Sequence, residues 1–347
     1  MISDNIIINK QSTLKEALIQ LNDIPHIQLL LVKDKDYKII GTLTDGDVRR
    51  GLIKGLSQSN FVEEFMSTSF IFLEKGKYDQ HKIDLIKSQK IKIIPVLNKD
   101  YSLYKILNFN DLKTILPIDA VIMAGGIGSR LMPLTKNTPK PMLKVGNKPI
   151  MDYNIDLLKS YGVHNITLSV KYLKQVIIDY YNSKIDLNID LNYITEDEPL
   201  GTIGAVKQIE IFHNDYILVM NSDLLTNIDL ESMFNTLTSQ NADMIVASTN
   251  YKVQIPYGVI ETKNHKVQRI VEKPTYTYYS SAGIYIFKRE LIDLIPSNSF
   301  FNATDLLDKL FELKKTVTHY PIKKYWLDIG NHVDFEKANE EVRNVNF

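Results

Sequence analysis

The first residues that could carry chemistry form a glycine-rich segment, GGIGSR, directly after the apolar run Ala120–Ala124. The apolar run predicts a buried strand. Because glycine adopts backbone conformations that other residues avoid, Gly125, Gly126 and Gly128 can gather their N–H groups around an anion. Arg130 adds a permanent, forked positive charge that suits phosphate oxygens. The segment therefore predicts a phosphate-binding loop.

Lys140 lies between Pro139 and Pro141 in a second segment that suits a phosphate ligand. The two prolines hold the backbone extended and present the ammonium group from a stiff segment. Two other phosphate motifs do not match. The chain has no Gly-Lys-Ser or Gly-Lys-Thr sequence, which excludes a Walker loop, and Leu131 stands where the dinucleotide fingerprint requires glycine or alanine.

Composition narrows the class of protein. The 347 residues suggest two domains, and equal counts of 41 basic and 41 acidic residues argue against a nucleic-acid partner. The absence of cysteine excludes disulfides, thiolate metal sites and cysteine nucleophiles. The beginning of the chain does not match a signal peptide, and the apolar runs are too short to cross a bilayer. We expect a cytoplasmic protein with no membrane partner.

Residues 1–116 are expected to form a first, α+β domain built on an internal repeat. Each copy reads as helix, strand, turn and strand, followed by a polar opening to a further helix. The expected elements of the first copy are Leu14–Leu21, Ile27–Val32, Ile39–Leu43 and Thr44–Asp47. Those of the second copy are Asp79–Lys87, Ile93–Leu97, Leu103–Leu107 and Asn108–Asp111.

Residues 118–347, after Pro117, are expected to form an α/β domain in which strands alternate with helices. The expected strands are Ala120–Ala124, Asn165–Lys171, Leu187–Ile194, Tyr216–Met220, Asp243–Ser248 and Gly283–Phe287. The expected helices are Met151–Tyr161, Tyr172–Tyr181, Ile203–Phe212, Thr304–Lys314 and Val333–Arg343. This alternation predicts a mixed, mostly parallel sheet covered on both faces, with ligands at the carboxyl ends of its strands.

Residues 121–150 closely resemble the signature of the sugar-1-phosphate nucleotidyltransferases, which include mannose-1-phosphate guanylyltransferases and glucose-1-phosphate thymidylyltransferases. The resemblance is carried by Arg130, Pro133, Leu134, Thr135, Pro139, Lys140 and Pro141. It implies a Rossmann-like domain, an NTP, a sugar-1-phosphate and Mg²⁺. Arg130 would contact the departing pyrophosphate and Lys140 the α-phosphate. The loop residues implied in nucleotide binding are Ala124, Gly125, Gly126, Gly128 and Ser129.

Later motifs follow the order of the same family. In TEDEPLGTIGAV, the resemblance places Gly201 and Thr202 at the base and ribose, although Thr202 could instead cap a helix. The resemblance also implies that Asp223 and Asp328 bind the metal ion. The alternative interpretation of Asp223 is that it caps a helix. Ser222 stands where the family usually has glycine.

A further group of residues is implied in sugar binding: Tyr257, Gly258, Glu272, Lys273, Ala282 and Gly283. Lys273 would bind the sugar phosphate and join the catalytic residues. The alternative interpretation of the Glu272–Lys273 segment is a charged turn. Ser281 replaces an asparagine that relatives often carry.

The acidic lead into PLGT is most similar to guanylyltransferases. A carboxylate accepts hydrogen bonds from both N1–H and the amino group of guanine, so Glu196 or Glu198 could select GTP. The fusion of this domain to the first domain, whose own resemblance follows below, is most similar to glucosamine-1-phosphate guanylyltransferases of legionaminic acid biosynthesis. Uridylyl or thymidylyl transfer to another hexose-1-phosphate stays open, as does a catalytically silent protein that senses sugar nucleotides.

The first domain resembles a tandem pair of cystathionine-β-synthase-type (CBS) modules, on the order of its elements and on the sequence GTLTDGDVRR. In that family a threonine and an aspartate bind an adenine nucleotide, and the matching residues are Thr44 and Asp47. Both could instead be helix caps. The pair could regulate the enzyme or assemble a homo-oligomer, and we expect an oligomer.

Overall fold

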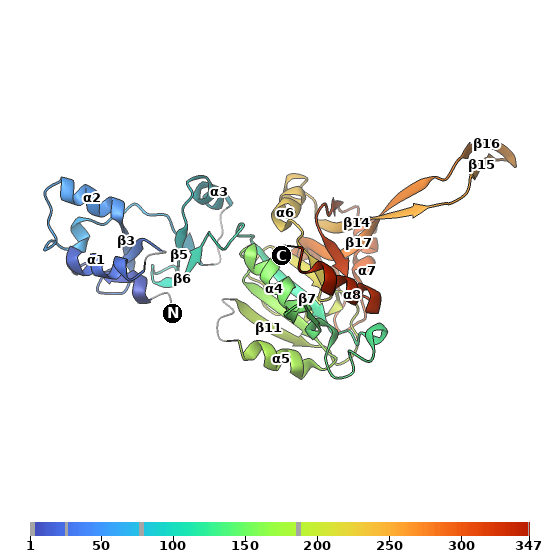
Figure 1. Cartoon of the computed structure of the whole chain (residues 1–347), viewed down its shortest axis with the longest axis horizontal. Coiled ribbons are helices and arrows are strands. Elements are labelled where there is room, and N and C mark those ends of the chain that lie inside the picture. Colours follow the sequence, from blue (N-terminus) through green and yellow to red (C-terminus); the bar gives the residue numbers. More distant parts are fainter. Residues whose placement is uncertain (1–3, 25–26, 76–79, 185–188, 346) are drawn as a thin grey trace. The chain divides into compact units, whose positions relative to one another are not determined.

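The computed structural model describes residues 4–24, 27–75, 80–184, 189–345 and 347. The chain divides into two compact units, Met1–Ile115 and Leu116–Phe347. Figure 1 shows both units coloured along the sequence. Each unit is described by itself.

The first unit contains two three-stranded sheets of the same design. One sheet is β1 (Ile7–Asn9), β2 (Leu29–Lys33) and β3 (Ile39–Thr44); the other is β4 (Leu73–Glu74), β5 (Ile93–Leu97) and β6 (Leu103–Asn108). In each, the first strand pairs in parallel with the second and the second pairs antiparallel with the third. The helices are α1 (Leu14–Asn22), α2 (Asp45–Ile53) and α3 (Gln80–Ser88). The arrangement is consistent with a pair of CBS modules.

The two copies differ at their ends. Thr44 leads into α2 as expected, but the described residues after Asn108 form turns and no helix, so the expectation of a further helix there is wrong. Asn108 explains the difference, because its side chain accepts from the N–H of Asn110 and donates to Asp111, which fixes a local turn. Pro117 also leaves little room for a helix before it. The expected start of α3, Asp79, lies outside the described residues.

The second unit is built on a seven-stranded sheet in the order β11-β10-β7-β12-β17-β14-β18. Its strands are β7 (Ile118–Ala124), β10 (Asn165–Val170), β11 (Asp190–Thr195), β12 (Tyr216–Asn221), β14 (Met244–Gln254), β17 (Thr275–Lys288) and β18 (Val317–Pro321). Only β17 runs against its neighbours. This confirms the predicted mixed, mostly parallel sheet; the first two residues of the expected strand Leu187–Ile194 lie outside the described part.

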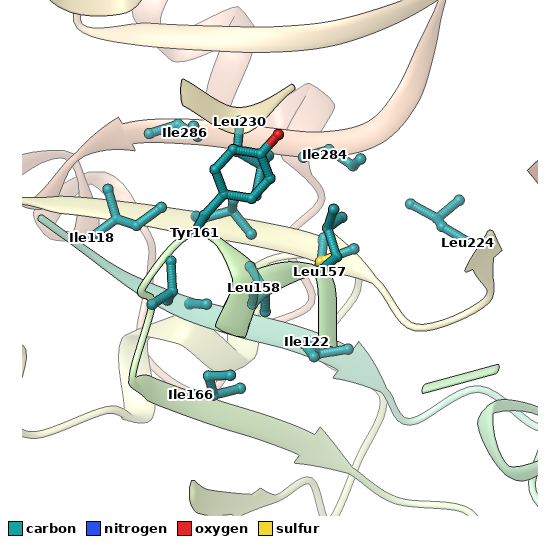
Figure 2. Packing of buried hydrophobic residues seen from close by; sticks show 14 of the residues in the cluster. Ile118, Ile122, Leu157, Leu158, Tyr161, Ile166, Leu224, Leu230, Ile284 and Ile286 are labelled. Carbon is teal, nitrogen blue, oxygen red and sulfur yellow. The ribbon is translucent and has the colours of Figure 1, made fainter. Parts of the chain in front are cut away.

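Helices cover both faces of this sheet. They are α4 (Ile150–Ser160), α5 (Lys174–Asn182), α6 (Leu230–Ser239), α7 (Ala303–Glu312) and α8 (His332–Glu341). In β7, Ile118 and Ile122 pack in one apolar cluster while Val121 packs in the cluster on the opposite face. Figure 2 shows the first cluster, where Tyr161 lies among side chains of α4, α6 and the sheet. Burial on both faces explains why the central strands are continuous apolar runs.

The segment expected to be a helix at residues 203–212 is instead a 3-10 turn, Gly204–Gln208. The N–H groups of Ile203 and Gly204 both donate to the carbonyl oxygen of Phe301, at 3.1 and 3.0 Å. The turn ends at Ile209, whose backbone is extended (φ −77°, ψ 117°), so the helical conformation stops after little more than one turn.

A second difference is a long antiparallel ribbon formed by β14 and β17. We expected strands at Asp243–Ser248 and Gly283–Phe287, but both continue well beyond the sheet. The hairpin β15 (Val259–Lys263) and β16 (Lys266–Val271) forms the outer end of this ribbon. Figure 1 shows it projecting from the body of the second unit. We call residues 249–281 the arm.

Within the described part of the chain, the helices are all too short or too polar to span a bilayer.

Candidate active site

The glycine-rich loop begins at the carboxyl end of β7, where the sequence places it. Gly128 has a φ of +69°, and a Cβ at this position would lie 3.0 Å from side-chain atoms of both Lys140 and Thr135. The hydroxyl of Thr135 donates to the carbonyl oxygen of Gly128 at 3.0 Å and holds the loop. A Cβ on Gly126 would meet no described atom within 4 Å, so this part of the loop faces open space. The loop is therefore fixed at one end and accessible at the other.

Lys140 connects this loop to the first expected metal ligand. It packs against Gly128, and its ammonium group forms an ion pair with Oδ2 of Asp223. The two side chains are only 13% and 21% exposed. The second oxygen of Asp223, Oδ1, is buried and has no hydrogen-bond partner in the structure. A buried acceptor without a donor is costly, so Asp223 has the capacity to bind a further ligand.

The fold brings Asp223 and Asp328 together. Asp328 ends the short strand β19 (Trp326–Asp328), which pairs antiparallel with β13 (Leu224–Thr226). Leu224 lies opposite Asp328, and the N–H of Ile329 donates to the carbonyl oxygen of Asp223 at 3.1 Å. Both carboxylates therefore stand at one edge of this strand pair. A shared metal ion requires the two carboxylates to be close, and the sequence alone could not show that they are.

Residues of β7 and α4 hold the turn before Asp223. The N–H of Ser222 donates to the carbonyl oxygen of Met123, and the side-chain amide of Asn154 donates to the carbonyl oxygen of Ser222, both at 3.2 Å. The first bond attaches the turn to the strand that carries the glycine loop, and the second attaches it to α4. The side chain that replaces the family glycine at Ser222 is buried. Asn154 escaped sequence reasoning; its one available signal was a polar residue on an otherwise apolar helix face.

The charges of the site act on Asp328. Partial burial of its carboxylate raises the pKa of Asp328. The nearby negative charge of Asp223 raises this pKa further. Lys140 and Arg130 oppose the shift. At Gly330 an added Cβ would lie 3.8 Å from Nη1 of Arg130 and 4.0 Å from Oδ2 of Asp328. Two carboxylates and two cations therefore gather at one place.

The two carboxylates fit a magnesium ion. Among the described residues there is no group of three or more His, Asp or Glu side chains that could hold a metal by themselves. Magnesium is usually bound by one or two carboxylates together with substrate phosphates and water. The unpartnered Oδ1 of Asp223 and the adjacent Asp328 supply such a pair.

The two candidate guanine-binding carboxylates have different surroundings. Glu196 is 7% exposed, and its oxygens accept from the hydroxyl of Ser169 and, at 3.1 Å, from the N–H of Leu200. A Cβ on Gly125 would lie 3.1 Å from Oε1 of Glu196, so this carboxylate supports the loop. The side chain of Glu198 is 89% exposed and lies 4.0 Å from the ammonium of Lys171. Of the two, Glu198 has the carboxylate that a ligand can reach, because its one ion pair is long and the side chain is exposed.

Gly201 and Thr202 form a tight turn against the start of α7. Gly201 has a φ of +76°, and a Cβ there would lie 2.6 Å from the carbonyl oxygen of Phe301. The hydroxyl of Thr202 accepts from the N–H of Ala303 at 2.9 Å, at the first residue of α7. Thr202 therefore does bond to a helix start, but to one distant in sequence.

The expected sugar-binding residues fall into two groups. Ala282 and Gly283 lie in the sheet beside the carboxylates: the indole of Trp326 donates to the carbonyl oxygen of Ala282 at 3.0 Å, and a Cβ on Gly283 would lie 2.6 Å from the amide nitrogen of Asn221. The indole was expected only to pack, so this hydrogen bond is an addition. The other group is carried by the exposed arm: Tyr257, Gly258, Glu272 and Lys273. Within one chain the structure does not bring this group to the carboxylates.

The candidate regulatory residues in the first unit bond to each other. The hydroxyl and N–H of Thr44 donate to Oδ2 of Asp47 at 2.6 and 2.9 Å, and together the two residues form a capping box at the start of α2. Oδ1 of Asp47 accepts from the guanidinium of Arg50 at 2.6 Å. This geometry is that of a helix cap.

The known proteins that resemble this chain match it over the second unit. The family model described as nucleotidyl transferase matches residues 119–345. The chain is 31% identical over 229 residues to the D-glycero-alpha-D-manno-heptose 1-phosphate guanylyltransferase of Aneurinibacillus thermoaerophilus, which covers 65% of this chain and 99% of that protein. It is 32% identical over 225 residues to the mannose-1-phosphate guanyltransferase of Yarrowia lipolytica, with 62% of this chain covered. The chain spans 61% of the length of that relative.

Solved structures give the same result. HddC of Yersinia pseudotuberculosis, solved alone and in complex with GMP-PN, is 30% identical, with a TM-score of 0.50 over 65% of this chain and 99% of that chain. The matched region contains the glycine loop, Lys140 and both carboxylates. Because the family model covers well over half of the chain, this protein belongs to the nucleotidyl transferase family.

Proposed function

We propose that the protein transfers a nucleotidyl group from an NTP, preferably GTP, to a sugar-1-phosphate and releases pyrophosphate. The observation that carries this proposal is the contact of Lys140 with Asp223 at the base of an accessible glycine loop, with Asp328 alongside. The similarity to a heptose-1-phosphate guanylyltransferase over nearly its whole length, and to a structure holding GMP-PN, supports the choice of GTP.

The chemistry needs charge neutralisation more than proton transfer. An oxygen of the sugar phosphate attacks the α-phosphorus, the bond from that phosphorus to the bridging oxygen breaks, and pyrophosphate leaves with the electron pair. The attacking oxygen is already anionic, so no general base is required. The obstacle is the repulsion between two polyanions, which fixed cations and positioning reduce.

Each cation has a place in this scheme. The N–H groups of the glycine loop would hold the triphosphate, with Arg130 on the departing pyrophosphate and Lys140 on the α-phosphate. Lys273 would bind the sugar phosphate. Asp223 and Asp328 would hold Mg²⁺, which when bound neutralises phosphate charge.

Separate residues are proposed to select the nucleotide and the sugar. Glu198 is our candidate for guanine because its carboxylate is exposed, whereas Glu196 is occupied by Ser169 and Leu200. Glucosamine-1-phosphate is the proposed sugar substrate, and Gly283 and Ala282 would line its site. Uridylyl or thymidylyl transfer to another hexose-1-phosphate remains the alternative.

The test is product formation. The purified protein is incubated with Mg²⁺, each of the four NTPs and a panel of hexose-1-phosphates, and the products are weighed by mass spectrometry. We expect a GDP-sugar and pyrophosphate from the wild type, and a loss of at least 100-fold in turnover for Lys140→Ala. Lys144→Ala, an exposed lysine nearby in sequence, is the matched control and should keep its turnover. A silent sugar-nucleotide sensor would release no pyrophosphate above background.

For the first unit we propose a CBS pair that either regulates the enzyme or assembles the oligomer. An adenine nucleotide held by Thr44 and Asp47 would have to replace the hydrogen bonds these residues make with each other. Calorimetry with AMP, ADP and ATP on the full chain separates the two roles, because assembly alone predicts no heat of binding.

A further inference from the structure

The arm is amphipathic across its two faces. In an antiparallel pair, directly opposite residues point to the same face and alternate residues point to opposite faces. Tyr251 lies opposite Tyr278 and Val253 lies opposite Tyr276, so these four side chains share one face. The other face carries Asn250, Lys252, Gln254, Thr275, Thr277 and Tyr279. One face of the ribbon is therefore apolar and aromatic, and the other is mainly polar.

The apolar face is uncovered in the single chain. Its four members are between 37% and 61% exposed. The outer hairpin is also apolar: Ile260 lies opposite Ile270 and both are more than half exposed, while Val259 lies opposite Val271 on the other face of the hairpin. A two-stranded ribbon in water is marginally stable by itself, and an alternating pattern is typical of a strand with one buried face. The pattern therefore indicates that something covers this face.

Charge complementarity favours a second copy of this chain as the cover. The arm contains five basic residues (Lys252, Lys263, Lys266, Arg269 and Lys273) and two acidic ones (Glu261 and Glu272). The whole chain has a net charge of zero, so the rest of the chain carries the compensating negative charge. The arm therefore has a net charge of +3 (five basic minus two acidic residues), opposite in sign to the net charge of the remainder of a second copy.

The available area also suits a dimer. The exposed parts of the three tyrosines and the valine of this face, together with those of Ile260 and Ile270 in the outer hairpin, amount to roughly 600 Å² per arm, against the ~800 Å² per partner of an ordinary stable interface. Two arms exchanged around a two-fold axis would double the contact, because the same surface is used twice.

We propose that the arm of one copy docks through this apolar face on a second copy and delivers Glu272 and Lys273 to the substrate site of that copy. The part that concerns Glu272 and Lys273 rests on the proposed function. It explains why these two residues lie on an exposed ribbon while Ala282 and Gly283 lie beside the carboxylates of their own chain. Glu272 also lies against Gly258, another expected sugar-binding residue of the arm, because a Cβ on Gly258 would lie 3.0 Å from Oε2 of Glu272. The arm thus carries its sugar-facing residues as one group.

The first test uses hybrid dimers of full-length chains. Lys140→Ala inactivates the body of one copy, and Lys273→Ala inactivates the arm of the other. The two variants are co-expressed with different affinity tags, and the hybrid is purified through both tags. If the arm acts on the other copy, one site of the hybrid is complete, and we expect about half of the wild-type activity per dimer.

The results are unambiguous in either direction. Activity of the hybrid that does not exceed the sum of the two inactive homo-oligomers would show that each arm serves its own chain and would overturn the proposal. Failure to recover any species that carries both tags would do the same. If the wild type itself made no nucleotide sugar, the proposed function would fail, whereas docking of the arm would still be tested by assembly.

The second test measures assembly by sedimentation. Tyr278→Lys places a charge on the apolar face, and Thr277→Lys places the same charge on the polar face of the same strand. We expect Tyr278→Lys to shift the dimer to monomer and Thr277→Lys to leave the dimer intact. Because the first unit could hold the copies together by itself, equal sedimentation of the two variants excludes the apolar face as the docking surface when the hybrid also shows no more activity than the two inactive homo-oligomers.

Discussion

The capping box of the first unit and the carboxylate site of the second contain similar residues in opposite states. Asp47 is buried, and its two oxygens accept from Thr44 and Arg50 of the same short segment. Asp223 is paired with Lys140 from a distant segment, and its other oxygen is buried without a donor. The comparison teaches that residue type alone does not identify a ligand site. What distinguishes the second site is an acceptor that the protein itself leaves unpaired.

The largest expected effect is that of Asp223→Asn. The change keeps the size of the side chain and removes its charge, so both the partner of Lys140 and a metal-binding oxygen are lost. We expect nucleotidyl transfer to fall by about 1,000-fold, measured as pyrophosphate release at saturating substrates. Asp156→Asn removes the surface pair with Lys148 and should change turnover little. If Asp223→Asn kept more than half of the activity, the contrast with Asp47 would have no functional meaning.

A smaller effect is expected from Arg130→Ala. Its guanidinium lies beside Asp328 at Gly330, where it can stabilise the departing pyrophosphate, and we expect a loss of about 100-fold in turnover. Arg50→Ala removes the arginine of the capping box instead, and turnover should stay near the wild-type value. Equal losses for the two variants would indicate a general effect on folding.

Asp47→Ala tests the first unit's half of the comparison, namely that Asp47 is a helix cap. This change removes the acceptor of the Thr44 N–H and hydroxyl, and we expect the first unit to lose about 1–2 kcal/mol of its free energy of unfolding. Faster hydrogen exchange along α2 would measure the loss. Unchanged exchange together with lost adenine nucleotide binding would instead show that Asp47 is a ligand residue.

The smallest effect is expected for recognition of the guanine base. Glu198→Gln removes one acceptor from an exposed carboxylate, so the preference for GTP over UTP should fall by about fivefold, close to 1 kcal/mol. The ratio of kcat/KM for the two nucleotides is the measurement. Glu210→Gln, another exposed glutamate of the same region, should leave this ratio unchanged.

Local patterns predicted the elements that are stabilised by their own sequence. The runs that became β5, β7, β10 and β12 are apolar and were located within one or two residues. Residues 203–212 have helical spacing but form a short 3-10 turn that ends at the extended residue Ile209, and the spacing does not indicate that end. The arm was missed because its strands alternate tyrosine and valine with polar residues and show no continuous apolar run.

The sequence by itself determined the α/β class of the second unit, the glycine loop at the end of β7 and the kinds of side chain that could neutralise phosphates. These features depend on neighbours in the chain, through the period of apolar residues and the freedom of glycine. Only the tertiary structure decided that Asp223 and Asp328 stand together, that Glu196 is occupied while Glu198 is exposed, and that Lys273 lies on an arm. The first outcome depends on strand pairing between segments about a hundred residues apart, and the others depend on side-chain hydrogen bonds and strand pairing that local spacing does not encode.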